Sequence, residues 1–220
     1  MRRLLGAAAS LGAGYLVGTL PSAEIVTRLA TRGQVDIRRV GTGNPGAANV
    51  AGVLGKKWGA VVMALDVAKG FAGARLGGKF AGDPGLHVGG PASVAGHCFP
   101  VWRRFEGGKG VATSGGQVFA TFPLYFPVDA AVAATTARLL NQRQAFAATE
   151  AASFTWILFS FVWWRRRLPN PGGCAPSVGL PLAALATSAI VRYRFLQTNQ
   201  QVEQWRAAQD DELRGPTLER

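Results

Sequence analysis

Apolar stretches of about the length of a bilayer alternate with short polar and basic segments along this chain. A helix crosses the hydrocarbon core with about 20 apolar residues. The first window, 4–23, carries no charged side chain, and Glu24 follows it directly. Further apolar windows with few charges follow, some of them shorter. The pattern predicts an all-α integral membrane protein with about seven transmembrane helices joined by short loops. The windows are 4–23, 58–74, 85–102, 111–128, 130–140, 145–164 and 174–191.

The first window also has features of a cleaved secretion signal. Arg2 and Arg3 precede it, and Ala7, Ala8 and Ala9 lie within it, as in the basic and small-residue regions of a signal peptide. Removal of this one segment would leave the other apolar windows unexplained. We therefore interpret it as the first transmembrane helix.

Basic residues gather in two of the segments between windows. Cytoplasmic loops of membrane proteins carry an excess of Lys and Arg. Both segments are therefore expected to face the cytoplasm, which puts the amino terminus outside. The first group is Arg28, Arg32, Arg38, Arg39, Lys56 and Lys57, and the second is Arg103, Arg104 and Lys109.

The second half of the chain follows this charge rule less well. With seven helices, the three arginines at 165–167 lie outside and the carboxyl-terminal tail lies inside. With 111–140 as a single helix, the arginines move inside and the tail moves outside. The sequence leaves both topologies open. It divides the chain into a membrane domain, 1–195, and a polar tail, 196–220, which is expected to be solvated and partly disordered.

Composition narrows the classes of partner. The 220 residues carry 24 basic and 12 acidic side chains, a net charge of +12, yet only 16% are charged, against roughly 25% in soluble domains. The 48% hydrophobic content excludes a disordered basic chain, and Cys98 and Cys174 are too few for a disulfide framework. Nucleic-acid binding is disfavoured because the basic residues are divided between apolar windows. Membrane lipids with anionic headgroups account for the same charge.

Charged residues at membrane depth are expensive and are candidates for a site. Asp66 and Lys69 are three residues apart on one helix face, and we interpret them as an ion pair that neutralises itself. Glu24 follows Pro21 at the end of the first window and is expected to reach water. The remaining charges of this kind, which have no obvious partner in the sequence, are Asp129, Arg138 and Glu150.

Two glycine-rich polar clusters, 36–49 and 96–113, lie in the segments assigned to the cytoplasm. Glycines that lead into a helix present backbone N–H groups at the positive end of the helix dipole, which suits a phosphate. Lys109 would add a full charge there. The second cluster is not a Walker A loop, because Gly110 stands where Ser or Thr should follow the lysine.

Two common kinds of catalytic site are unsupported by the sequence. A catalytic histidine followed by an aspartate after four intervening residues is missing, because Ala92 and Trp102 stand five positions after His87 and His97. A serine in a Gly-x-Ser-x-Gly nucleophile elbow is also missing from the sequence.

The ordered set of motifs resembles the bacterial membrane acyltransferases that transfer a fatty acyl group from acyl phosphate to glycerol 3-phosphate. This resemblance implies seven membrane-spanning helices in the bacterial inner membrane. It also implies transfer to the sn-1 hydroxyl, giving lysophosphatidate and phosphate in phospholipid synthesis, with no metal and no other cofactor. The motifs that carry it are 18–22, 36–49, 54–57, 65–70 and 96–113.

The resemblance also implies a set of site residues. Acyl phosphate is a mixed anhydride, so the site must hold two phosphates, bring a hydroxyl to about 3 Å from the carbonyl and stabilise the oxyanion. Three residues are expected to be catalytic: His97, Lys109 and Asn44. His97 either orients the hydroxyl or accepts its proton, or it only bonds a loop carbonyl. The expected substrate-binding residues are Ser22, Arg38, Thr42, Gly43, Asn49, Lys56, Gly107, Gly108, Gly110 and Thr113.

This chain departs from the family pattern at three places. Thr42 replaces a serine, Gly52 replaces an arginine, and the third motif of the family is not reproduced in 192–199. Arg194 or Asn199 could substitute there, although neither aligns residue by residue. These changes favour an intact donor site and an altered acceptor site. Two alternatives therefore stay open: a paralogue that uses another acceptor, and a non-catalytic membrane protein that binds or regulates the enzyme.

Overall fold

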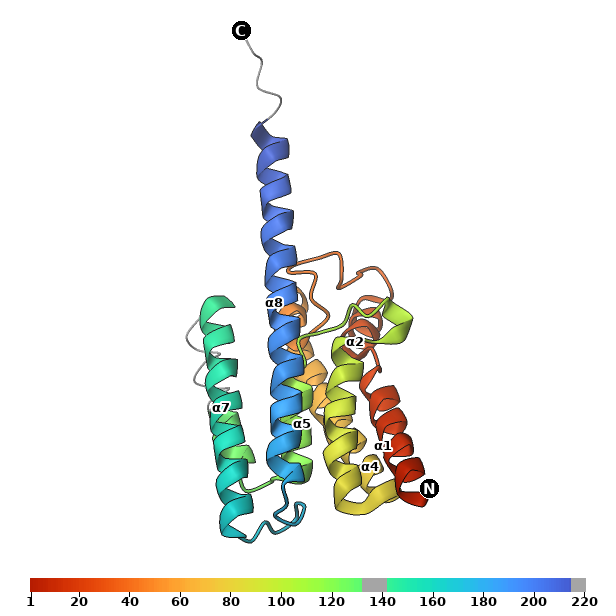
Figure 1. The fold of residues 1–220 in the computed structure, drawn as a ribbon. Helices are drawn as coiled ribbons and strands as arrows, with labels where there is room; N and C mark the ends of the chain where they lie inside the picture. Colours follow the sequence, from red (N-terminus) through yellow and green to blue (C-terminus); the bar gives the residue numbers. More distant parts are fainter. Residues whose placement is uncertain (132–141, 215–220) are drawn as a thin grey trace.

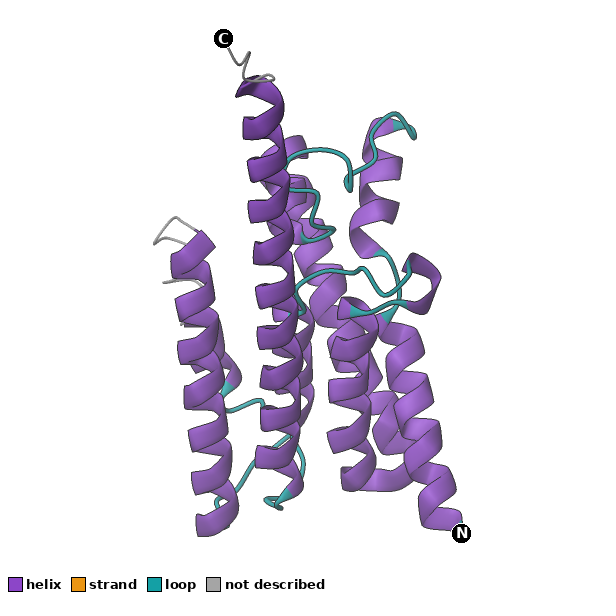
Figure 2. Cartoon of the chain, turned by 45° about the horizontal axis from the view of Figure 1, so that its top comes forward, coloured by secondary structure: helices purple, strands orange, loops and turns teal. Residues whose placement is uncertain are grey.

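The computed structural model describes residues 1–131 and 142–214, and this part of the chain forms helices joined by loops, without a strand (Figures 1 and 2). The window at 130–140 lies almost entirely outside the described residues. Within the described part there are seven α-helices and one short 3-10 helix. They are α1 (Arg2–Gly18), α2 (Ser22–Thr31), α3 (Ala47–Leu54), α4 (Lys56–Cys98), η1 (Val101–Arg103), α5 (Val111–Thr121), α7 (Gln142–Arg166) and α8 (Gly179–Arg214).

Helix α4 is a hairpin of two helical arms at the centre of the bundle. Its backbone leaves the helical region at Ala81 and Gly82, and Gly82 has a φ of 62° that favours glycine. Pro84 lies in the first turn of the second arm, where its missing N–H costs little. The two arms account for the windows at 58–74 and 85–102, and α4 contacts α1, α2, α3, α5 and α8.

Glycines allow the arms of α4 and helix α1 to pack backbone against backbone. A Cβ added at Gly14 would overlap the carbonyl oxygen of Gly89, and one at Gly18 would overlap that of Ser93. A Cβ at Gly77 would overlap the carbonyl oxygen of Gly85 across the hairpin. Close approach through small residues is typical of membrane helices, and here it determines the spacing of the bundle.

The distribution of side chains is that of a membrane protein. Large apolar side chains are exposed, including Leu11 and Leu16 on α1 and Phe154 on α7, whereas Ser10 and Ser160 on the same helices are fully buried. Among the described residues, the helical stretches Arg2–Thr31 and Ala145–Arg166 are long and apolar enough to cross a membrane. The first of these is interrupted at Leu20 and Pro21, so α1 and α2 are separate helices.

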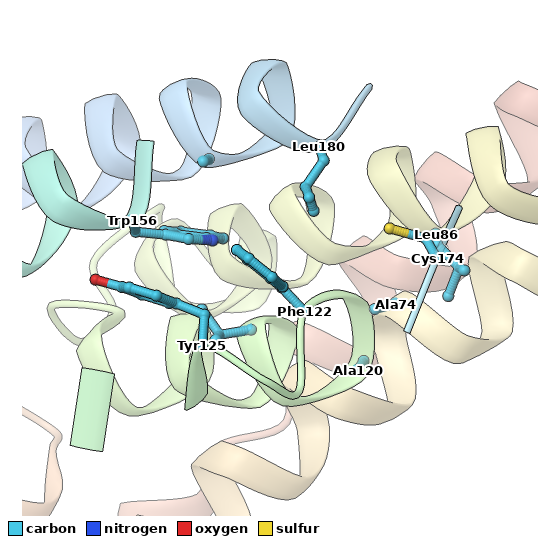
Figure 3. Packing of buried hydrophobic residues seen from close by; sticks show 10 residues of the cluster. Ala74, Leu86, Ala120, Phe122, Tyr125, Trp156, Cys174 and Leu180 are labelled. Atoms are coloured by element: carbon cyan, nitrogen blue, oxygen red, sulfur yellow. The ribbon is translucent and has the colours of Figure 1, made fainter. Parts of the chain in front are cut away.

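An aromatic cluster joins α7 and α8 to the rest of the bundle. Figure 3 shows the rings of Phe122 and Tyr125, which follow α5, next to Trp156 of α7 and Leu180 of α8. The Tyr125 hydroxyl lies 2.7 Å from the Thr155 hydroxyl. Away from this cluster, Glu150 pairs with Arg192 between the same two helices, so its partner lies 42 residues away.

Both motif loops lie at the same end of the bundle, opposite the amino terminus (Figure 1). The loop that follows α7, and with it the three arginines at 165–167, lies at the amino-terminal end. This arrangement agrees with the seven-helix topology. The polar segment from 196, expected to be partly disordered, continues α8 as helix to Arg214 and extends beyond the bundle.

Candidate active site

A small pocket lies where the two motif loops meet the break between α1 and α2. Its volume is about 30 Å³, room for one or two water molecules. Both arms of α4 and η1 complete its walls. It is lined by Gly18, Thr19, Leu20, Pro21, Ser22, Ala23, Glu24, Arg38, Pro45, Asp66, Lys69, His97, Pro100, Arg103, Glu106, Gly107 and Gly108.

A buried charged cluster forms the floor of this pocket. Lys69 Nζ lies 2.8 Å from Asp66 Oδ1, which confirms the predicted ion pair. The ammonium also donates to the Leu20 carbonyl at 3.0 Å and to the Ser22 hydroxyl at 3.4 Å. His97 Nδ1 lies 3.6 Å from the same Asp66 oxygen. The pair is therefore part of the pocket, a position that its spacing in sequence did not indicate.

The second motif loop is bound to the end of α4 by its own backbone. Gly107 N–H donates to the Cys98 carbonyl at 3.0 Å, and Gly108 N–H donates to the His97 carbonyl at 3.1 Å. A Cβ at Gly108 would overlap the His97 ring, so glycine lets the loop lie against the imidazole. Two backbone donors that were expected to hold phosphate are thus used within the protein.

Four charged side chains surround the mouth of the pocket. Arg38 Nη2 donates to Glu106 Oε2 at 3.2 Å, and its Nη1 lies 3.7 Å from Glu24 Oε1. Arg103 pairs with the other oxygen of Glu24. The expectation that Glu24 simply reaches water was wrong, because its side chain is only 14% exposed and contacts two arginines.

The first motif loop is organised by Asn49. Its Oδ1 accepts a hydrogen bond from Thr42 N–H at 2.8 Å, and its Nδ2 donates to the carbonyls of Ile37 and Val40. This buried amide therefore stabilises the loop from within. Thr42, Gly43, Asn44 and Asn49 do not line the pocket, whereas Arg38 of the same loop does.

Other predicted residues lie around the pocket without lining it. Lys109 Nζ lies 4.2 Å from the centre of the Phe195 ring. Burial, followed by the nearby Arg194 guanidinium, lowers the pKa of Lys109 to about 8. Thr113 is fully buried against α4, and Lys56 is exposed at the start of α4. Gly110, with a φ of 84°, begins α5.

The structure thus divides the predicted residues into two groups. Five of them line one pocket: Ser22, Arg38, His97, Gly107 and Gly108. The pocket adds four charged residues that sequence reasoning had not placed in a site: Glu24, Asp66, Lys69 and Arg103. Depth in the membrane was the sequence signal for Asp66 and Lys69.

Arg194 connects α8 to the second motif loop. Its Nη2 donates to the Gly107 carbonyl at 2.8 Å, and its guanidinium lies 5.8 Å from the centre of the Phe99 ring. The side chain is buried. Of the two residues considered for the divergent third motif, Arg194 therefore reaches the site, while the side chain of Asn199 lies outside the described part.

We expect Arg194→Ala to lower kcat/KM about tenfold or more, because a buried charge-assisted hydrogen bond is worth ~1.5–3 kcal/mol and it holds the loop at Gly107. The matched control is Arg192→Ala on the same helix, which removes an exposed pair with Glu150 worth about 0–1 kcal/mol. Initial rates at varied concentrations of the acceptor that the resemblance implies give kcat/KM for both variants. Equal losses in the two would contradict the role of Arg194.

A second, more open cavity of about 510 Å³ lies between α8 and the loop that follows η1. Glu106 lines it as well as the pocket, so the two cavities are neighbours. Its walls combine aromatic rings with cationic and amide groups. The other lining residues are Phe99, Arg104, Phe105, Tyr193, Arg194 and Gln197.

Comparison with known proteins agrees with these features. Residues 8–202 match the family described as glycerol-3-phosphate acyltransferase. The glycerol-3-phosphate acyltransferase of Thermoanaerobacter pseudethanolicus is 39% identical over 150 residues, covering 68% of this chain and 74% of that protein. That of Allorhizobium ampelinum is 37% identical over 186 residues, covering 83% and 80%.

Solved structures agree in fold as well as in sequence. The crystal structure of PlsY, an integral membrane glycerol 3-phosphate acyltransferase, in its glycerol 3-phosphate form matches with a TM-score of 0.68 at 33% identity, covering 90% of this chain and 93% of that one. The lysophosphatidic acid form matches with a TM-score of 0.70, covering 91% and 93%. This chain therefore belongs to the glycerol-3-phosphate acyltransferase family of integral membrane proteins.

Proposed function

We propose that this membrane enzyme, a glycerol-3-phosphate acyltransferase of phospholipid synthesis, takes its acyl group from acyl phosphate and transfers it to the sn-1 hydroxyl of glycerol 3-phosphate. The observation that carries the proposal is the pocket itself. It joins both motif loops and places two arginines at its mouth above a buried histidine. The structures of PlsY with glycerol 3-phosphate and with lysophosphatidic acid support the same acceptor and product.

The reaction needs no covalent acyl-enzyme. The acceptor oxygen bonds to the acyl carbonyl carbon, the bond from that carbon to the phosphate oxygen breaks, and phosphate leaves with the bonding electron pair. The hydroxyl proton passes to the departing phosphate or first to a neighbouring base. The protein therefore contributes chiefly by holding the two substrates in contact and by stabilising the oxyanion.

The pocket matches the acceptor in chemistry, although its mouth must open to admit a molecule of that size, since its volume is about 30 Å³. Arg38 and Arg103 at the mouth provide planar guanidinium groups, which bind phosphate with paired hydrogen bonds. A glycerol backbone extending inward from them would reach Ser22 and His97. His97 is buried with one ring nitrogen toward Asp66, and we assign it the role of orienting the acceptor hydroxyl.

The donor fits the neighbouring cavity. An acyl phosphate has an apolar chain and an anionic head, and the aromatic and cationic walls formed by Phe105, Tyr193 and Arg194 suit both parts. Lys109 lies beside Arg194 and provides further positive charge. Glu106 lines both cavities, and Gly108 of the same loop lies against the His97 ring, so the two substrates would meet across this loop beside His97.

The direct test is turnover by the purified protein in detergent micelles. With palmitoyl phosphate and glycerol 3-phosphate we expect lysophosphatidate and phosphate in equal amounts. Parallel reactions with palmitoyl-CoA, or with glycerol in place of glycerol 3-phosphate, should give little product. Product from palmitoyl-CoA alone would overturn the donor assignment, and preference for another acceptor would favour the divergent-paralogue alternative.

The lowered pKa of Lys109 predicts a pH dependence. The ammonium is charged below a pKa of about 8 and loses its charge as the pH rises through that value. Because the charged form attracts phosphate, the KM for acyl phosphate should rise above about pH 8. Lys109→Arg keeps the charge throughout this range and should flatten the profile between pH 7 and 9. If the rise in KM above about pH 8 persists unchanged in Lys109→Arg, it comes from the titration of another group.

A further inference from the structure

The mouth of the pocket has a charge balance that is unexpected for a site binding anions. Among the described residues that line the pocket, three cations, Arg38, Lys69 and Arg103, stand against three carboxylates, Glu24, Asp66 and Glu106. Asp66 and Lys69 pair at the floor. The mouth is therefore left with two arginines and two glutamates, and its formal charge is zero.

The two glutamates occupy the hydrogen-bonding directions of the arginines. Glu106 accepts from Arg38 Nη2 at 3.2 Å, and Glu24 pairs with Arg103 while lying 3.7 Å from Arg38. Carboxylate and phosphate oxygens match the guanidinium group in the same planar, two-bond manner. A phosphate that binds the same guanidinium nitrogens therefore competes with a carboxylate for them.

The small volume of the pocket also indicates that a carboxylate must move before a phosphate can bind. About 30 Å³ accommodates one or two water molecules, so a phosphate group needs side chains at the mouth to move. Glu106 is the residue best placed to move. Its side chain is 58% exposed, and it follows Arg104 and Phe105, whose positive φ values mark a tight loop. Arg38 keeps a second bond, from Nη1 to the Glu106 carbonyl at 3.0 Å, which does not need the carboxylate.

We infer that Glu24 and Glu106 are specificity-determining residues, which hold the two arginines until a substrate phosphate replaces their carboxylates. This inference rests on the proposed function. A dianionic phosphate competes well for both arginines, whereas a singly charged carboxylate such as glycerate gains little by exchange with a carboxylate already bound. The glutamates thus weaken binding of every anion by the same factor, so that a dianionic phosphate still binds while a singly charged anion, which gains less from the two arginines, does not.

The test measures binding and does not need turnover. Titration calorimetry of the purified protein with glycerol 3-phosphate, at low and at high salt, compares wild type with Glu106→Gln and Glu24→Gln. We expect each variant to bind about two- to fivefold more tightly at low salt, the range typical of partly exposed ion pairs. The gain should shrink at high salt because charges near the surface are screened. Binding of D-glycerate should be too weak to measure in the wild type and should strengthen by a similar factor in each variant.

The matched control is Glu150→Gln, which breaks an exposed pair with Arg192 away from the pocket and should leave binding unchanged. Unchanged or weaker binding of glycerol 3-phosphate in Glu106→Gln, with a normal melting temperature, would overturn the inference and leave the glutamates as loop anchors. Arg103→Gln should weaken binding in either case and shows that the assay senses the mouth. Failure of the wild type to make lysophosphatidate would instead overturn the proposed function. The binding result could still be interpreted, because it does not depend on turnover.

Discussion

Replacing Lys69 with alanine is expected to abolish measurable acyl transfer and to lower the free energy of unfolding by about 3–5 kcal/mol, the usual cost of breaking a buried ion pair from one side. The change leaves the Asp66 carboxylate buried without its cation. It also removes the ammonium that donates to the Leu20 carbonyl and the Ser22 hydroxyl. These two hydrogen bonds hold the break between α1 and α2 at the pocket.

A double variant separates the structural part of this effect from the functional part. Asp66→Asn combined with Lys69→Met removes both charges with little change in volume, and such replacements of buried pairs are often neutral or stabilising. We expect thermal unfolding in detergent to recover toward the wild-type midpoint while turnover stays low. Full recovery of turnover in the double variant would show that the pair serves stability alone.

The second large effect is expected at Gly18. A Cβ at this position would overlap the backbone of Ser93 in the second arm of α4, and backbone cannot move aside as a flexible side chain can. Overpacking of this kind costs ~1–3 kcal/mol or more, so Gly18→Ala should lower the melting temperature. Because Gly18 also lines the pocket, the shift of α1 should reduce acyl transfer as well.

The same helix provides the control for this prediction. Gly12 has open space around its Cβ position, and alanine is favoured over glycine inside a helix by up to about 1 kcal/mol. Gly12→Ala should therefore be neutral or slightly stabilising, with normal turnover. Melting curves of the two variants side by side test the packing. Equal melting temperatures would mean that α1 and α4 do not meet as the structure has them.

Hydrophobic pattern and motif spacing were enough to predict an all-helical integral membrane protein of this family. The length of the apolar windows is a local property, and a bilayer selects it directly. The Asp66–Lys69 pair was predictable for the same reason, since three residues along a helix lie on one face. The close approach of α1 and α4 at Gly14 and Gly18 could not be predicted in this way, because sequence spacing alone does not show whether a second backbone lies opposite a glycine.

The sequence by itself therefore determined the helical membrane fold, the family and the two loops that carry its motifs. Only the tertiary structure decided which charges meet in the pocket. Arg38 and Glu106 are 68 residues apart, and Glu24 and Arg103 are 79 residues apart. Pairs this distant depend on how α4 folds back on itself and on how closely its glycines let α1 approach. No local spacing encodes those distances, so the neutral mouth of the pocket emerges only when the helices are packed.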